Sequence, residues 1–209
     1  EPGPVAQSPA FARAVFPLQR QPGLRHLVDA RQRPFLIQGD SPWSILVQLT
    51  REEAELYLAD RQRRGFNTIL VNLLEHKYSA DSPRNRYGHA PFRVADDYGT
   101  PNSDYFDHAA WVVRAAADKG ILVLLAVTYI GCCGEDGWYA QMLANGPARM
   151  REYGRFLGRR FREFDNIMWV HGGDANPLDQ GIVREVALGI RDVDTVKLHT
   201  AHTAPGFQA

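Results

Sequence analysis

The chain has 209 residues, of which 44% are hydrophobic and 23% are charged. These proportions are typical of a globular domain and exclude an intrinsically disordered chain. The 24 basic residues balance the 24 acidic residues, so no long-range electrostatic field attracts nucleic acid or an anionic membrane. We therefore expect no nucleic-acid or membrane partner, and a neutral or weakly charged small-molecule substrate fits better.

The sequence also excludes a membrane span and a disulfide framework. Its longest apolar run, 121–127, is far shorter than the roughly 20 residues that cross a bilayer. Cys132 and Cys133 are adjacent, a position where disulfides are rare because the bond geometry is strained, and two cysteines provide no thiolate zinc cluster. The chain opens at Glu1, as expected after removal of a signal peptide or in a clipped fragment.

Five segments predict strands because they are rich in apolar and β-branched residues. The segment 121–128 is almost entirely apolar, as expected of a parallel strand that is covered on both faces. A further apolar segment, 24–29, precedes the first strand, and the two predict a hairpin whose second arm becomes the first core strand. The predicted strands are residues 35–38, 66–74, 121–128, 166–171 and 196–201.

Four helices are predicted between these strands. Thr50 and Glu53 form a capping box that begins the first helix, and Gly65 is placed to end it. The second and third helices repeat apolar residues at the spacing of a one-sided helix, and Pro147 suits the first turn of the third. Asp179 is expected to cap the fourth. The predicted helices cover residues 50–64, 104–119, 147–164 and 179–191, and the main loops cover 75–102 and 129–145.

The alternation of strands and helices leaves two architectures, an open doubly wound sheet or a closed barrel. The first strand of a nucleotide-binding open sheet usually precedes a glycine-rich turn, but residues 38–43 read Gln-Gly-Asp-Ser-Pro-Trp. Polar and aromatic residues gather after the strand ends, where barrel enzymes have their active sites. We therefore predict an α/β fold, a (β/α)8 TIM barrel. Residues 1–23 are a loosely structured leader, and residues 24–209 are the N-terminal portion of the barrel, with about five β/α units.

Asp174 is the candidate catalytic acid. Cleavage of a glycosidic bond needs a protonated carboxyl that gives its proton to the leaving oxygen, and a second carboxylate that attacks or activates water. Asp174 follows the apolar strand 166–171 and two glycines, which allow backbone and sugar to approach closely. Partial desolvation at the barrel mouth would help the carboxyl keep its proton. The alternative is a simple turn with a helix-capping aspartate.

Ten further residues are candidates for substrate binding because they lie at or after strand ends. Trp43, Tyr129 and Trp138 offer rings that stack on sugar faces, although a large aromatic residue is more often core. Asp40 and Glu75, which end the first two strands, either bind sugar hydroxyls or form a structural salt bridge or cap. The histidines contact substrate, orient a carboxylate or are simply buried. The candidates are Asp40, Trp43, Glu75, His76, Lys77, Tyr129, Trp138, His171, Asn176 and His202.

Four ordered motifs, at residues 33–43, 65–77, 100–102 and 166–174, resemble the apiosidase-like glycoside hydrolases. The resemblance implies a (β/α)8 catalytic domain of a bacterial, secreted or periplasmic enzyme that needs no cofactor. It also implies a polysaccharide or oligosaccharide substrate, with release of apiose-linked side chains from pectin, and Asp174 as the acid/base. The partner carboxylate is then expected on a later strand, beyond residue 209, so that this segment alone is expected to be inactive.

Two alternatives remain open from the sequence. A metal-dependent barrel hydrolase would use His171, Asp174, His199 and His202 as ligands. However, His199 and His202 are three residues apart, so a regular strand points them to opposite faces, and we predict no metal site. A carbohydrate-binding relative without catalytic activity is the second alternative.

Overall fold

Five parallel strands form the main sheet of the computed structural model, which describes residues 13–132, 136–176 and 179–206. The strands follow one another in the sheet in their order along the chain, and each neighbouring pair is parallel. This sequential parallel order is that of a (β/α) barrel and confirms the predicted fold class. The strands are β4 (Gly39–Asp40), β5 (Thr68–Asn72), β6 (Leu122–Tyr129), β7 (Ile167–Gly172) and β8 (His199–His202).

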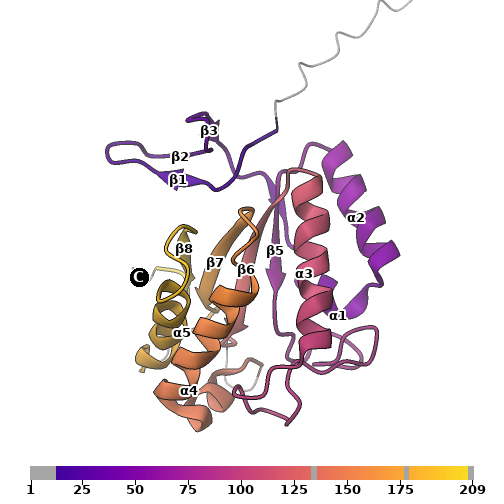
Figure 1. The fold of residues 1–209 in the computed structure, drawn as a ribbon, viewed down its shortest axis with the longest axis vertical. Coiled ribbons are helices and arrows are strands. Elements are labelled where there is room, and N and C mark those ends of the chain that lie inside the picture. The colour runs from indigo at the N-terminus through magenta and orange to yellow at the C-terminus, as the bar shows by residue number, and fades with distance from the viewer. Residues whose placement is uncertain (1–12, 133–135, 177–178, 207–209) are drawn as a thin grey trace, which may run out of the picture.

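The long helices α2 to α5 lie on one face of this sheet (Figure 1). The predicted capping box is confirmed: the Thr50 hydroxyl accepts from the Glu53 N–H, and the Glu53 carboxylate accepts from the Thr50 N–H. α4 begins before Pro147, within the expected loop 129–145, because the chain leaves helical geometry only at Gly146 (φ 74°) and then resumes it. No helix in the described ranges is long and apolar enough to cross a membrane. The helices are α1 (Ile45–Gln48), which was not predicted, α2 (Arg51–Arg63), α3 (Ser103–Asp118), α4 (Tyr139–Arg160) and α5 (Gly181–Arg191).

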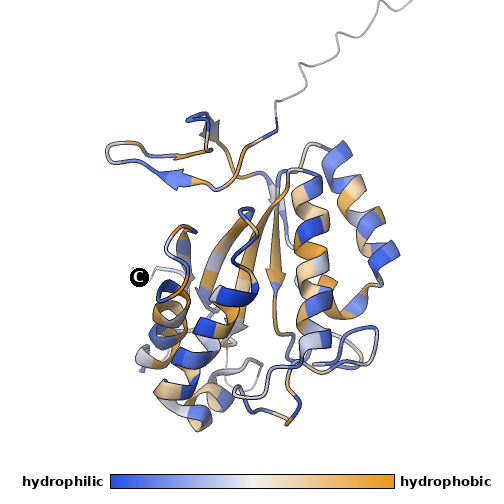
Figure 2. Ribbon diagram, in the orientation of Figure 1, coloured by the Kyte–Doolittle hydropathy of each residue, from blue (hydrophilic) through white to orange (hydrophobic). Residues whose placement is uncertain are grey.

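The sheet buries apolar side chains on both faces. Toward the helices, Trp169 and its neighbours on β5 and β6 join the main hydrophobic core, and Figure 2 shows these strands as largely hydrophobic. On the other face, Leu122 and Met168 pack against Leu18 and Phe35 from the N-terminal segment. Because full burial of one such side chain is worth about 1.5–3 kcal/mol, this second cluster holds the N-terminal segment against the sheet.

The N-terminal segment forms a small antiparallel sheet at the end where the main strands start (Figure 1). Its second and third strands are the predicted hairpin, but the second arm ends at Phe35 and the first core strand is separate, which corrects that part of the prediction. Structure also begins before residue 24, because Leu18 is buried; residues 1–12 of the expected leader lie outside the described ranges. The three strands are β1 (Gln19–Arg20), β2 (Leu27–Val28) and β3 (Pro34–Phe35).

Candidate active site

Neighbouring strands hold the carboxylate of Asp174 from both sides. The sheet register pairs Gly172 of β7 with Tyr129 of β6 and with His202 of β8, so the three strands end at one level. The Tyr129 hydroxyl donates to Asp174 Oδ2 at 2.8 Å, and His202 Nε2 lies 2.7 Å from Asp174 Oδ1. Three of the predicted site residues therefore meet in one hydrogen-bonded group.

Gly172 allows this group to form. Its φ is 102°, and a Cβ at this position would overlap the carbonyl oxygen of His202. The next N–H, of Gly173, donates to the same oxygen at 3.0 Å. A side chain at residue 172 would strain the backbone and push β8 away from β7. The close approach at Gly172 is therefore one between the backbones of β7 and β8.

A cavity of about 670 Å³ opens beside Asp174. The Trp43 ring stacks on the His202 ring with centroids 5.9 Å apart and planes 17° apart, and it lies 6.3 Å from the Tyr129 ring. The Asp174 side chain is 52% exposed, so that it is accessible to a bound molecule. Aromatic walls beside a carboxylate are suited to binding a sugar ring.

The hydroxyl groups near Asp174 remain protonated at neutral pH. Burial raises the pKa of Tyr129, and the hydrogen bond to Asp174 raises it further. Burial also raises the pKa of Tyr78, whose hydroxyl donates to Asp136 Oδ2 at 3.1 Å. Both phenols therefore serve as hydrogen-bond donors to carboxylates.

Asp40 and Glu75 make structural contacts at the ends of the first two strands. Asp40 Oδ2 accepts from the Tyr57 hydroxyl at 2.7 Å and from Arg61 at 2.8 Å, and these partners lower the pKa of Asp40. Glu75 is buried, and its oxygens accept from the Ser44 hydroxyl at 2.6 Å and from the His76 N–H at 2.9 Å. Of the two roles that the sequence leaves open for each carboxylate, the structure displays the structural one.

Trp138 lies in the hydrophobic core, which is the second of the two roles that the sequence leaves open for it. It is 3% exposed, it precedes the first turn of α4, and its indole N–H donates to the Leu74 carbonyl at 3.3 Å. The His76 ring packs edge-on against it at 5.1 Å, and both line a second cavity of about 500 Å³. Lys77 is exposed, with Nζ 5.9 Å from the centroid of the Tyr78 ring.

His171 is buried and pairs with His199. The two rings are parallel with centroids 5.1 Å apart, and His171 Nε2 lies 2.9 Å from His199 Nδ1. Burial lowers the pKa of His171 to about 3 and, with the charge of Arg191, the pKa of His199 to about 4. By strand alternation His171 shares the helix-facing side of β7 with Trp169, and Asn176 nearby accepts from the Ala204 N–H at 3.2 Å.

The histidines of the metal-site alternative fall into two separate contacts. His171 contacts His199, whereas His202 contacts Asp174, as expected if His199 and His202 point to opposite faces of β8. In the described ranges, no group of three or more His, Cys, Asp or Glu side chains could hold a metal ion.

Several residues near the site were not among the sequence candidates. Tyr78 and Tyr57 line the Asp174 cavity, and Asp136 is buried beside Tyr78. The position of Tyr78 in the polar loop 75–102 was the only available signal.

Cys132 is disulfide-bonded, contrary to the expectation for adjacent cysteines, and Cys133 lies outside the described residues.

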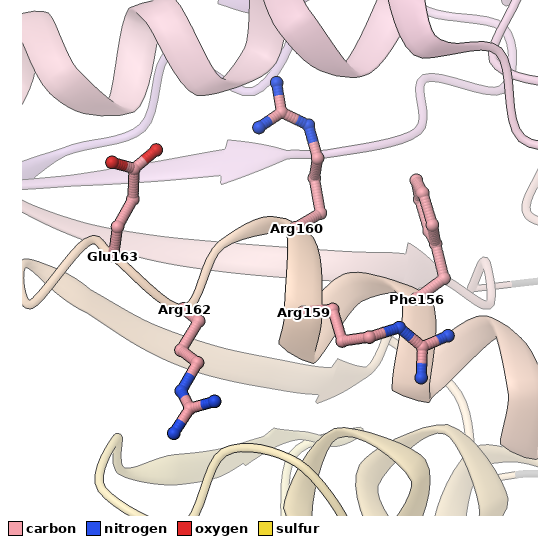
Figure 3. Close-up of a pocket in the computed structure, with 5 residues that line it drawn as sticks. All are labelled: Phe156, Arg159, Arg160, Arg162 and Glu163. Atoms are coloured by element: carbon pink, nitrogen blue, oxygen red, sulfur yellow. The ribbon is translucent and has the colours of Figure 1, made fainter.

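A shallow crevice at the end of α4 is rich in arginine but forms no convergent site. Its guanidinium groups, from Arg159, Arg160 and Arg162, point in different directions (Figure 3). Arg160 is paired with Asp107 of α3 at 2.5 Å. This surface agrees with a solvated helix face, on which charges contribute little to binding or stability.

Comparison with known proteins identifies the family. The sequence model of the protein family described as "Apiosidase-like, catalytic domain" matches residues 21–208. The chain belongs to this apiosidase-like family. The match confirms the resemblance in the sequence motifs and covers every described element of the main sheet. No protein with a curated description matches the chain.

Solved structures of glycoside hydrolases resemble the apiosidase-like chain over most of its length. A protein described as "Glycoside hydrolase" superposes with a TM-score of 0.75 at 27% identity, covering 90% of this chain and 41% of its own. A family 5 glycoside hydrolase from Bacteroides vulgatus gives a TM-score of 0.75 at 24% identity, covering 90% of this chain and 39% of its own. An endo-1,4-beta-mannanase from Rhizomucor miehei gives a TM-score of 0.64 at 11% identity, covering 91% of this chain and 63% of its own. At this identity the likeness shows a shared fold alone. The chain thus spans about 40% of the length of the first two.

Proposed function

We propose that this apiosidase-like chain is the N-terminal part of the catalytic barrel of a secreted or periplasmic glycoside hydrolase that releases side chains from pectic polysaccharide. The observation that carries the proposal is the position of Asp174: its carboxylate follows the fourth barrel strand and lies beside an aromatic-walled cavity, with the Tyr129 hydroxyl on one side and His202 Nε2 on the other. The family match and the glycoside hydrolase neighbours support the reaction class.

In the proposed reaction Asp174 is the acid/base. Its protonated carboxyl gives the proton to the glycosidic oxygen as the carbon–oxygen bond breaks and the bonding electrons move to that oxygen. A second carboxylate, on a later strand of the full-length protein, attacks the sugar carbon or activates water. Trp43 and Tyr129 form the wall against which the sugar ring packs. General acid catalysis of this kind contributes about 10²–10⁴-fold to the rate.

The test is a substrate comparison with the full-length protein that contains this chain. Apiose-containing pectic fragments, mannan and cellulose oligosaccharides are incubated with wild-type protein, with Asp174→Asn and with Asp179→Asn, and released sugar is measured. The N-cap of α5 is Gln180, which corrects the expectation that Asp179 caps this helix. The exposed Asp179 accepts from the Gly181 N–H through Oδ1, a contact that the asparagine oxygen can also make, so it is the matched control. We expect release from pectic fragments by wild type and Asp179→Asn only. Binding of the fragments without release would contradict the proposal and indicate a non-catalytic relative.

A further inference from the structure

The second cavity, of about 500 Å³, lies beside the Asp174 cavity and has no part in the reaction described above. Its walls come from the loop 75–102, which follows β5, and from the start of α4, which follows β6. His76 lines this cavity, whereas Tyr78, two residues later, lines the Asp174 cavity. The two cavities are therefore neighbours at the end of the sheet where the strands finish.

The loop that builds the second cavity is held by its own hydrogen bonds. The buried Asn85 accepts from the N–H groups of Tyr87 and His89 through Oδ1, both at 3.0 Å. Asn102 Nδ2 donates to the Ala90 carbonyl at 2.8 Å. The walls are thus formed before any ligand arrives, and a ligand that binds a preformed cavity loses little free energy to ordering of the protein.

The walls carry polar groups that lack a partner. Within the described residues, His76 Nδ1, His89 Nδ1 and Gln141 Oε1 are buried without a hydrogen bond. Buried polar atoms in folded proteins are nearly always paired, because an unpaired one has lost its bonds to water. Imidazole and amide groups can donate to and accept from the hydroxyls of a sugar. Trp138 and Phe92 add aromatic wall, with ring centroids 6.5 Å apart, and such a mixed lining is typical of a ligand site.

The charges along the cavity select the ligand further. Arg84 and Arg93 are exposed in its wall, and neither forms an ion pair with any residue that the structure describes. The Arg84 guanidinium is held by a hydrogen bond to the Gly88 carbonyl at 3.1 Å. Asp96 lines the same cavity, so two arginines and one aspartate leave a single positive charge. A singly charged carboxylate matches this charge better than a doubly charged phosphate does, and guanidinium groups bind carboxylates through paired hydrogen bonds.

We propose that the second cavity binds a sugar residue that carries a carboxylate, a uronate. Arg84 and Arg93 bind its carboxylate, and the unpaired polar groups of the walls bind its hydroxyls. The inference rests on the proposed function and deepens it: because the cavity adjoins that of Asp174, the uronate belongs to the same polysaccharide substrate and holds the chain while the bond at Asp174 is cleaved.

The first test is a binding comparison with the full-length protein. Calorimetry measures the affinity for trigalacturonate and for galactotriose of the same linkage. We expect wild type to bind the acidic trisaccharide at least about tenfold more tightly, because hydrogen bonds between charged groups are the stronger ones. The double variant Arg84→Gln/Arg93→Gln should lose this preference, and Arg84→Lys/Arg93→Lys, which keeps the charge, should retain part of it. Arg159→Gln, on the solvated face of α4, is the control and should keep it fully.

Three results would overturn the inference. The first is equal affinity of wild type and the double glutamine variant for trigalacturonate. The second is a preference that Trp43→Ala abolishes and the double glutamine variant keeps, which would place the acidic sugar in the Asp174 cavity. The third is displacement of trigalacturonate by inorganic phosphate at lower concentration than by acetate, which would identify a phosphate site.

Kinetics separate this inference from the proposed function. On pectic fragments Arg93→Gln should raise KM by about tenfold and change kcat by less than about twofold, as expected when an interaction holds substrate and transition state equally. A fall in kcat at constant KM would overturn the inference. If no glycoside is hydrolysed but the preference for trigalacturonate depends on the two arginines as described, the uronate site stands and the proposed function fails.

Discussion

The buried His171–His199 pair makes the stability of the fold depend on pH. Both imidazoles have folded-state pKa values below the ordinary 6.5, about 3 for His171 and about 4 for His199. In the unfolded chain both bind protons as the pH falls through about 6.5, whereas in the folded chain they stay neutral. Stability is therefore complete above about pH 6.5 and is lost as the pH falls from there toward 3.

The size of this stability loss follows from the difference between the pH of the measurement and the pKa of the imidazole in the unfolded chain. At about pH 5, protonation of one imidazole stabilises the unfolded chain by about 2 kcal/mol, whereas the folded chain, in which the imidazole stays neutral, gains nothing. This value follows from about 1.4 kcal/mol per pH unit. His171 contributes this amount, because it is buried between the sheet and α5. His199 is more exposed, so we reduce its share to about 1 kcal/mol for solvent screening. We expect a total loss of about 3 kcal/mol between pH 7 and pH 5.

The assay is equilibrium urea unfolding of the full-length protein at pH 7 and pH 5. His171→Gln cannot take up a proton in this range and should remove about 2 kcal/mol of the pH-dependent loss. His26→Gln, at an exposed position before β2, is the control and should change nothing. An equal pH dependence in wild type and His171→Gln would refute the reasoning. If His171→Gln does not fold, NMR of wild-type His171 decides the matter, because a buried neutral imidazole must not titrate above pH 5.

Three further substitutions test the packing. Trp138→Ala should lower the free energy of unfolding by about 3–5 kcal/mol, measured by urea unfolding, because Trp138 is core; weaker substrate binding at unchanged stability would show instead that it is a sugar platform. Gly154→Ala should cost about 1–3 kcal/mol and reduce the melting temperature, because its Cβ would overlap the Val186 carbonyl where α4 packs on α5; an unchanged melting temperature would contradict this close packing. Thr50→Ala should cost about 1 kcal/mol through loss of the capping box, and Thr50→Ser should restore most of it.

The main sheet and most helices could be predicted because their signals are local. The apolar run at 121–128 corresponds to β6, and the capping box at Thr50 fixed the start of α2. Less local features were missed. β4 has only two residues, which is too short for an apolar pattern, and the start of α4 was hidden by Gly146, which resembles a loop end.

The site was predicted in part for the same reason. Asp174 follows two glycines at a strand end, a signal contained in six consecutive residues. Its contact with His202, and the pairing of His171 with His199, depend on the register between β7 and β8, which no spacing within one strand reveals. The burial of Trp138 depends on how a loop folds back over the core. Composition alone does not distinguish such a loop from an exposed one.

The central claim is that Asp174 is the catalytic acid. The most direct test asks how the activity lost in an Asp174→Asn variant depends on the leaving group of the substrate. The full-length protein and its Asp174→Asn variant are compared on two apiosides, one with a phenol and one with a dinitrophenol leaving group. Only the poor phenol leaving group needs a proton from the enzyme. The account predicts that kcat/KM falls by about 10²–10⁴-fold on the phenyl apioside and by less than about tenfold on the dinitrophenyl apioside. An equal loss on both substrates, or at least half of wild-type activity on the phenyl apioside, would contradict it.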